Sequence, residues 1–201
     1  MLQHVRPAVV LLLLFSALTG LVYPLAVTGI AQLAMPRQAN GSLIEKDGVI
    51  VGSALIGQNF KSDRYFHPRP SATTDTDPND SSKTIDAPYN AANSTGSNLG
   101  PTSQKLVDRV KASVEAWRAA AGPGLVPADA VATSASGLDP DVSPQAALAQ
   151  VASVAKARGL DEGKVRQLVE AAIETRFLGL IGEPRVNILR LNLALDQLKS
   201  S

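Results

Sequence analysis

Residues 7–36 read PAVVLLLLFSALTGLVYPLAVTGIAQLAMP and contain no Asp, Glu, Lys, Arg or His. A helix needs about 20 apolar residues to cross the hydrocarbon core of a bilayer, and this run exceeds that length. The run therefore predicts a single transmembrane helix over residues 7–35, with residues 1–6 as a short tail. No later stretch of the chain is uncharged and apolar over a comparable length.

A cleaved signal peptide is the competing interpretation of the same residues. Arg6 can serve as its basic start, residues 9–14 as its apolar core, and Gly29-Ile30-Ala31 as a small-x-small cleavage site. The apolar cores of signal peptides have about 7–15 residues, which favours a retained anchor here. The chain is thus a single-span protein or a secreted one.

Small and hydroxyl-bearing residues recur every four positions within this run. Such a stripe allows the backbones of two membrane helices to approach closely and to form hydrogen bonds, although these residue types are also ordinary in membrane helices. Proline in the middle of the run also predicts a local kink. The candidate packing residues are Ser16, Gly20, Pro24 and Thr28.

Charge and cysteine content exclude several classes of protein. The 201 residues carry 19 Lys+Arg and 18 Asp+Glu, a net charge of +1. Without Arg6 and Arg37, the part beyond residue 40 has 19 − 2 = 17 basic and 18 acidic residues. This balance argues against a nucleic-acid binder. With 0 Cys, disulfides, thiolate metal sites and cysteine nucleophiles are excluded.

Residues 36–201 predict one soluble α/β domain of a size that buries an ordinary core. Residues 42–53 predict a short β-hairpin around Asp47-Gly48, because glycine after aspartate suits a tight turn. Residues 67–102 are rich in Pro, Ser and Asp without apolar periodicity, and predict a long irregular loop.

Helical periodicity predicts about four helices in the rest of the domain. The first covers Leu106 to Trp117 and ends at Gly122. Further helices are predicted from Ser143 to Gly159, from Asp161 onward, and near the end through Leu191, Leu195 and Leu198. Strands are expected at residues 185–189 and, weakly, at 130–133.

The inventory of reactive residues predicts neither a catalytic centre nor a metal site. His67 is the one imidazole available to the domain, and no Gly-x-Ser-x-Gly elbow accompanies it. The carboxylate pairs Asp75/Asp77 and Asp139/Asp141 lie among turn residues. The single Gly-Lys, Gly163-Lys164, lacks the Ser/Thr of a phosphate-binding loop. These features are typical of an accessory protein.

One polar stretch could wrap an anion with exposed backbone amides. A tight turn fixed by its own Asn and Ser side chains explains the same composition. The residues of this candidate anion-binding loop are Asn93, Ser94, Gly96, Ser97 and Asn98.

Several distinctive sequence blocks occur in order along nearly the whole chain. Two are especially specific, Tyr65-Phe66-His67-Pro68-Arg69-Pro70-Ser71 and Gly182-Glu183-Pro184-Arg185-Val186-Asn187. The others are Tyr23-Pro24-Leu25, Leu55-Ile56-Gly57-Gln58, Tyr89-Asn90-Ala91, Ser97-Asn98-Leu99-Gly100-Pro101 and Ser136-Gly137-Leu138-Asp139-Pro140. Together these blocks resemble the KdpC family, the C subunits of the bacterial high-affinity potassium-transporting P-type ATPase.

The resemblance implies a single-pass protein of the cell inner membrane, with a cytoplasmic N-terminus and a periplasmic domain. The implied partners are the potassium-binding channel-like subunit, the ATP-hydrolysing P-type subunit and a small single-span subunit. The family is described as a catalytic chaperone that raises the ATP affinity of the hydrolysing subunit and that carries a Ser/Gly-rich loop. In this sequence the loop would be Asn93 to Asn98, which makes that stretch a candidate nucleotide loop, and Thr95 stands where its second glycine is expected.

We therefore expect a non-catalytic subunit that binds no cofactor stably and meets ATP, if at all, through a transient complex with the hydrolysing subunit. A periplasmic domain cannot reach cytoplasmic ATP, so we expect any effect on the ATP affinity of the hydrolysing subunit to act by conformational linkage. A membrane-anchored extracytoplasmic hydrolase or ligand-binding domain is the alternative. The candidate partner-facing residues are Tyr65, Phe66, Arg69, Tyr89 and Arg185.

Overall fold

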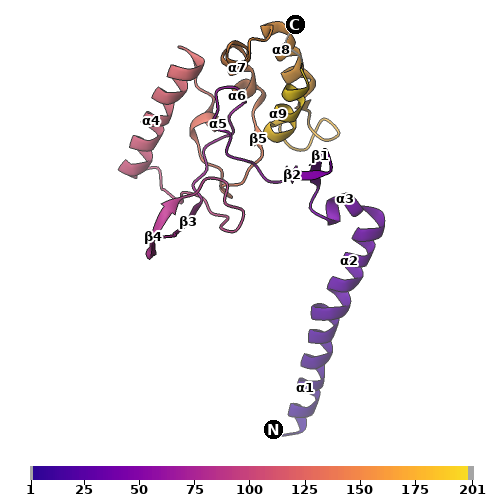
Figure 1. Ribbon diagram of the computed structural model, residues 1–201. Helices are drawn as coiled ribbons and strands as arrows, with labels where there is room; N and C mark the ends of the chain where they lie inside the picture. The colour runs from indigo at the N-terminus through magenta and orange to yellow at the C-terminus, as the bar shows by residue number, and fades with distance from the viewer. Residues whose placement is uncertain (1, 199–201) are drawn as a thin grey trace. The chain divides into compact units, whose positions relative to one another are not determined.

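The computed structural model describes residues 2–198 (Figure 1). By its internal contacts the chain forms two compact units, Met1–Ser53 and Ala54–Ser201. The first consists of a long helix, a short helix and a hairpin, and the second is a small α/β domain.

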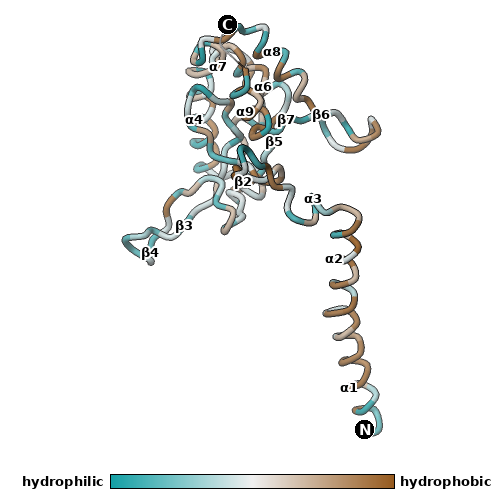
Figure 2. Tube along the Cα trace, turned by 45° about the vertical axis from the view of Figure 1, so that its right-hand side comes forward, coloured by the Kyte–Doolittle hydropathy of each residue, from teal (hydrophilic) through white to brown (hydrophobic). Residues whose placement is uncertain are grey.

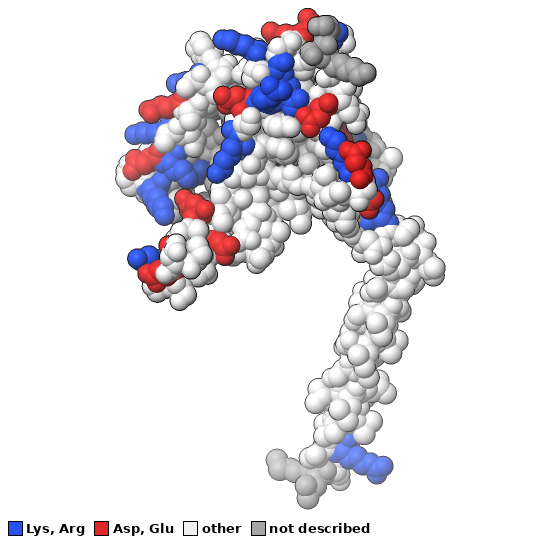
Figure 3. All heavy atoms as spheres, viewed as in Figure 1, with Lys and Arg blue, Asp and Glu red and all other residues white. Residues whose placement is uncertain are grey.

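The first unit begins with one long helix built from α1 (Leu2–Ala17), a π-helical turn η1 (Leu18–Val22) and α2 (Tyr23–Ala34). The helix is long and apolar enough to span a membrane, and none of its most apolar window is buried in the structure. Figure 3 shows it almost free of charged side chains beyond its N-terminal end. This agrees with the predicted transmembrane helix in length and composition.

The irregularity predicted at Pro24 is a π-helical turn that directly precedes it. Proline has no N–H group, so it cannot donate to the carbonyl four residues back. The Tyr23 N–H donates to the carbonyl of Leu18, five residues back, and the Thr19 hydroxyl donates to the carbonyl of Phe15 at 2.7 Å. Single π-helical turns of this kind are a recognised cause of helix irregularity.

Past α2, the short helix α3 (Pro36–Ala39) is tied back to the long helix. The amides of Gln32 and Asn40 exchange hydrogen bonds, 3.3 Å and 3.1 Å between donor and acceptor. The hairpin β1 (Leu43–Lys46) and β2 (Val49–Ser53) follows and confirms the predicted turn. Asp47 and Gly48 have φ of 53° and 77°, as a two-residue hairpin turn requires.

The second unit contains small antiparallel sheets and several helices. One sheet is the hairpin β3–β4, and the other has the strand order β5-β7-β6. The elements are β3 (Thr74–Asp77), β4 (Asp80–Asp86), α4 (Gln104–Ala121), α5 (Ala128–Val131), β5 (Asp141–Val142), α6 (Pro144–Ala149), α7 (Val151–Arg158), α8 (Glu162–Ala171), β6 (Ile173–Glu174), β7 (Arg185–Asn187) and α9 (Ile188–Gln197).

The core of this domain lies where the short sheet meets α6, α7, α8 and α9. Val186, on the central strand β7, has no exposed surface, and neither does Phe66, which lies in the loop before β3. The buried apolar cluster is Phe66, Val142, Ala146, Ala147, Val151, Val154, Ala155, Val165, Val169, Val186, Ile188, Leu191 and Leu195. Burial of these side chains is the main force holding the helices on the sheet.

The predicted helix boundaries rest on side chains that satisfy free backbone groups. Ser143 caps α6 by accepting from the Ala146 N–H, and Asp161 caps α8 by accepting from the Lys164 N–H. Gly159 ends α7 in the left-handed conformation, with φ of 66°. These three predictions are confirmed, and each follows from ordinary capping chemistry.

Four expectations differ from the structure. The stretch 67–102 is not irregular throughout, because β3 and β4 form a polar hairpin within it. The helix expected from Ser143 to Gly159 breaks at Gln150 into α6 and α7. Residues 128–131 form a helical turn instead of a strand at 130–133, and the strand at 185–189 is shorter because α9 starts at Ile188.

Candidate functional site

Two buried amide side chains hold the backbone of Phe66 and His67. The Asn192 side chain accepts from the Phe66 N–H at 2.9 Å and donates to the Phe66 carbonyl at 3.0 Å. Gln150 accepts from the His67 N–H at 2.7 Å and donates to the His67 carbonyl at 3.2 Å. We call Gln150 and Asn192 the amide clamp. It satisfies the backbone N–H and carbonyl groups of this non-repetitive segment, as a neighbouring strand would.

Next to the clamp, Tyr65 packs in a small cluster at the surface. Its hydroxyl donates to Asp196 at 3.3 Å, and the guanidinium of Arg158 lies over its ring, 4.6 Å from the centroid. Arg158 also forms an ion pair of 2.7 Å with Asp196. Phe60 lies 5.4 Å away, ring to ring. Tyr65 is therefore a rigid, half-buried surface group.

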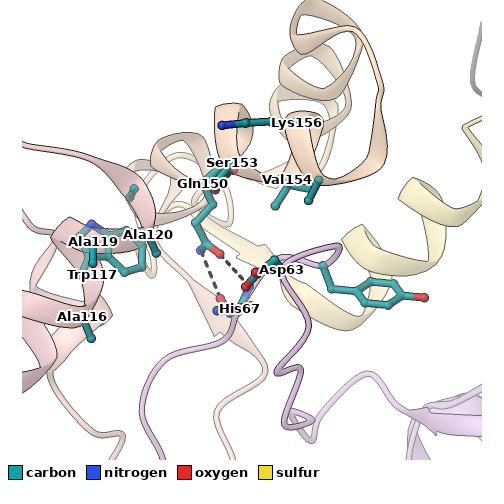
Figure 4. A pocket seen from close by; sticks show the side chains of 13 residues that line it. Asp63, His67, Ala116, Trp117, Ala119, Ala120, Gln150, Ser153, Val154 and Lys156 are labelled. Atoms are coloured by element: carbon teal, nitrogen blue, oxygen red, sulfur yellow. Dashed lines mark hydrogen bonds between the residues drawn. The ribbon is translucent and has the colours of Figure 1, made fainter.

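A cleft of about 660 Å³ opens between α4 and α7 beside His67 (Figure 4). Its walls are largely apolar, with Trp117 and alanines of α4 facing Val154 of α7, and Asp63 and Lys156 supply charged groups. The His67 ring nitrogen Nε2 lies 3.2 Å from the Ser62 carbonyl, so the imidazole has a local hydrogen-bond acceptor. The cleft is an apolar groove with few polar groups, as small-molecule sites often are.

Arg69 and Tyr89, both predicted to face partners, lie together and use their polar groups inside the domain. Arg69 forms an ion pair of 2.7 Å with Asp139, and the Tyr89 hydroxyl donates to the Arg69 carbonyl at 2.7 Å. A Cβ on Gly57 would lie 2.4 Å from the Tyr89 ring, so glycine is required there. Burial, with a smaller contribution from the Asp139 charge, raises the pKa of the Tyr89 phenol.

Arg185 belongs to an ion-pair network on the β5–β7–β6 sheet. It pairs with Glu174 at 3.0 Å and with Asp141 at 3.2 Å, and Arg190 pairs with the other Glu174 oxygen at 3.0 Å. Burial raises the pKa of the Asp141 carboxyl despite the opposing effect of Arg185. Arg69 and Arg185 line one open cleft of about 490 Å³.

Several polar side chains of the candidate nucleotide loop form hydrogen bonds with neighbouring parts of the domain. The Asn93 amide donates to the Thr74 carbonyl at 2.9 Å, and the Ser94 hydroxyl donates to the Ser136 carbonyl at 3.0 Å. The Ser97 hydroxyl accepts from Thr133 at 3.4 Å, and Asn98 takes φ of 50°. A Cβ on Gly96 would lie 2.7 Å from the Ala135 carbonyl oxygen. This loop is a packed polar turn.

The remaining predicted residues occupy two different settings. Ser16, Gly20, Pro24 and Thr28 are exposed on the long helix, and a Cβ on Gly20 would meet nothing within 4 Å. Phe66 lies in the domain core with 0% exposure, so its side chain is not at the surface to meet a partner. Among residues 2–198, no group of three or more His, Asp or Glu side chains could hold a metal ion.

Buried amides hold the Phe66–His67 segment, and connected ion pairs hold the β5–β7–β6 sheet. Burial accounts for the raised pKa of Tyr89 and of Asp141. Figure 3 shows basic and acidic side chains interspersed over the visible face of the domain. These features are suited to a surface whose side chains are already ordered.

Comparison with known proteins matches residues 5–197 to the family described as KdpC, K+-transporting ATPase, c chain. A relative from Bradyrhizobium diazoefficiens, named potassium-transporting ATPase KdpC subunit, is 64% identical over 197 residues, and the alignment covers 98% of both chains. One from Rhodopseudomonas palustris BisB18 is 63% identical over 199 residues, covering 99% of this chain and 100% of the relative. One from Methylobacterium nodulans is 63% identical over 198 residues, covering 98% of both.

The chain belongs to the KdpC family. The match covers the long helix, the hairpin and the α/β domain alike. This confirms the resemblance carried by the Tyr65–Ser71 and Gly182–Asn187 blocks. The KdpC fold uses both blocks structurally, the first under the amide clamp and the second as β7 with its ion pairs.

Sequence reasoning missed the residues that hold these KdpC blocks in place. Gln150 and Asn192 make the clamp, Arg158 and Asp196 hold Tyr65, and Glu174 joins two arginines. A signal existed for the clamp, since each amide interrupts an otherwise apolar helical face. Their partners could not be read from periodicity, because they lie 83 and 126 residues away along the chain.

Proposed function

We propose that this chain is an accessory, non-catalytic subunit of an ATP-driven potassium uptake complex, and that ion transport and ATP hydrolysis are carried by its partner subunits. The observation that carries the proposal is the similarity to potassium-transporting ATPase KdpC subunits over nearly the full length of both chains. The proposed partners are the channel-like potassium-binding subunit, the ATP-hydrolysing P-type subunit and the small single-span subunit.

In this proposal the long helix is retained as a membrane anchor. Its length and exposed apolar surface support a span that other helices or lipid cover. The stripe of Ser16, Gly20, Pro24 and Thr28 is the face on which a partner helix packs closely. The protein then lies in the inner membrane, with its N-terminus in the cytoplasm and its α/β domain in the periplasm.

The domain stabilises the assembly and raises the ATP affinity of the hydrolysing subunit by conformational linkage, without binding ATP itself. The polar turn at 93–98 supports this, because its Asn93 and Ser94 side chains are engaged within the domain. Gly96 packs against a carbonyl oxygen, which repels phosphate, where an anion site would present N–H groups. Linkage requires only that this subunit bind one conformation of its partner more tightly.

The half-buried side chains of Tyr65 and Arg69, next to the amide clamp, form the proposed contact surface for the channel-like subunit. Tyr65 and Arg69 are supported from behind, Tyr65 by Arg158 and Arg69 by Asp139. Pre-ordered aromatic and arginine side chains lose little conformational entropy on binding, so they suit a subunit interface.

Co-purification tests the proposal. The affinity-tagged full-length chain, expressed with the other pump subunits and extracted in mild detergent, is expected to bring them down in fixed proportion. Deletion of the chain is expected to abolish growth at micromolar potassium, with recovery on complementation. A chain that purifies alone and whose loss leaves such growth unchanged would overturn the proposal and favour a free-standing hydrolase or ligand-binding domain.

Protease accessibility in spheroplasts tests the orientation separately. With the domain in the periplasm, external protease is expected to degrade it while the membrane is intact. Protection until the membrane is opened would place the domain in the cytoplasm and would contradict the proposed orientation.

A further inference from the structure

Residues 177–181, which we call the apolar finger, form an uncovered apolar loop between β6 and β7. The side chains of Phe177, Leu178, Leu180 and Ile181 are 66–84% exposed. Figure 2 shows the loop projecting beyond β6 and β7 with an apolar tip. The other large exposed apolar residues of the domain are far apart in sequence, at Leu55, Ile85, Val107 and Leu125. Soluble proteins rarely leave such a cluster uncovered without a partner.

The apolar finger has a defined conformation. The Phe177 and Ile181 backbones exchange hydrogen bonds of 2.9 Å and 3.0 Å, closing the tip. At its base the Arg176 guanidinium pairs with the Glu183 carboxylate at 2.6 Å. The finger leads directly into β7, whose Val186 is fully buried. The finger therefore has a closed tip, a base held by an ion pair, and a short connection to a buried strand.

Its backbone also shows strain at a bulky residue. Leu178 has φ of 52°, a conformation that glycine or asparagine adopts far more readily than leucine. Gly179 and Gly182 also have positive φ, and a Cβ on either would meet nothing within 4 Å. A leucine in this strained conformation, with its side chain in solvent, supports a contact outside this chain.

We infer that the apolar finger inserts into an apolar pocket on a membrane-spanning subunit of the same complex, on the part of that subunit that stands outside the bilayer. This inference rests on the proposed function. It assigns residues 177–181 as the anchor of the soluble domain on its partner.

The chemistry of the finger favours protein over lipid. Segments that bind membrane surfaces usually combine Lys or Arg with Trp or Tyr at the lipid headgroups. Residues 173–184 contain no Lys, Trp or Tyr, and Arg176 is neutralised by Glu183. A closed, pre-formed tip suits a shaped pocket, because little conformational entropy is lost on insertion.

The small size of the apolar finger favours a partner that the chain also contacts elsewhere. Stable interfaces bury about 800 Å² on each partner, which four side chains cannot supply. A second copy of this chain held by fingers alone would be weakly bound. A membrane-spanning subunit that also packs against the long helix gains from both contacts, since the first raises the effective concentration for the second.

Site-specific photo-crosslinking in the intact complex tests the inference. A photo-reactive phenylalanine analogue is placed at position 177 or 180 of the full-length chain, with position 125 as the control because Leu125 is fully exposed elsewhere on the domain. We expect positions 177 and 180, but not 125, to form an adduct that mass spectrometry identifies as a membrane-spanning pump subunit. Adducts with lipid, adducts with a second copy, or no adduct would overturn it.

Truncation of the tip gives a second measurement. The combined Phe177→Ser and Leu180→Ser variant is expected to recover about tenfold less partner subunit per chain than wild type, whereas Leu125→Ser recovers the wild-type amount. The fluorescence of Trp117 should be unchanged, showing that the domain has folded. Equal recovery with the tip variant would overturn the role of the finger and leave the proposed function standing. Failure of the wild-type chain to recover partners would overturn the proposed function itself.

Discussion

Replacing Asn192 with leucine removes half of the amide clamp. Asn192 is only 1% exposed, and its side chain satisfies both the N–H and the carbonyl of Phe66. Each buried backbone group left without a hydrogen bond costs about 1–3 kcal/mol. With some compensation from the apolar side chain, the expected loss in unfolding free energy is about 3 kcal/mol. In a domain of this size that lowers the melting temperature by roughly 6–12 °C.

Urea unfolding of the full-length chain in mild detergent, followed by tryptophan fluorescence, measures this loss. The chain has one Trp, and Trp117 packs against the domain core, so the signal reports on unfolding of the domain. Gln167→Leu on the exposed face of α8 is the matched control and should be nearly neutral. A loss below about 1 kcal/mol for Asn192→Leu would refute the importance of the clamp.

The second half of the clamp gives a sharper form of the same test. Gln150 holds His67, the next residue along the same segment. If the segment detaches as a unit, Asn192→Leu and Gln150→Leu together should cost less than the sum of the single losses. Strict additivity would show that the two amides act independently.

Three further predictions concern separate parts of the domain. Gly57→Ala should lower the unfolding free energy by about 1–3 kcal/mol, because its Cβ would overlap the Tyr89 ring, whereas Gly100→Ala, with open space around it, serves as the control in a thermal melt. Burial raises the pKa of Asp141 above its ordinary 3.8, so the folded state holds this proton more tightly than the unfolded state. The protonated carboxyl therefore stabilises the folded state below the ordinary pKa, and this contribution to the unfolding free energy is lost as the pH rises through the raised pKa. Relative to wild type, Asp141→Asn should therefore gain stability in urea unfolding as the pH rises through the raised pKa, and a pH-independent difference would contradict this. His67→Ala should support wild-type growth at low potassium, because the clamp holds the backbone of this residue and not its ring; loss of growth in a folded variant would show a role for the imidazole.

Local features of the fold could be predicted where one residue type settles the local geometry. An uncharged run of sufficient length predicts the long helix, Asp47-Gly48 the first hairpin, and Ser143 and Asp161 two helix starts. The β3–β4 hairpin was missed because most of its residues are exposed on both faces, so no alternation of apolar and polar residues marks its strands.

Tertiary contacts account for the other misses. Apolar periodicity continues through Gln150, and the helix breaks there where the side chain turns to the backbone of His67. Of the predicted surface residues, Phe66 is buried, while Tyr65 and Arg69 depend on Arg158 and Asp139, which are remote in sequence. Composition alone cannot specify such pairings.

The ATP dependence of potassium-stimulated hydrolysis by the pump, measured with and without this chain, tests the central claim most directly. An accessory subunit that acts by conformational linkage should lower the apparent KM for ATP, and pump lacking it should show a raised KM or lose activity through failed assembly. Restoring the full-length chain should restore the wild-type curve. Identical rates and identical ATP dependence with and without the chain would contradict the account.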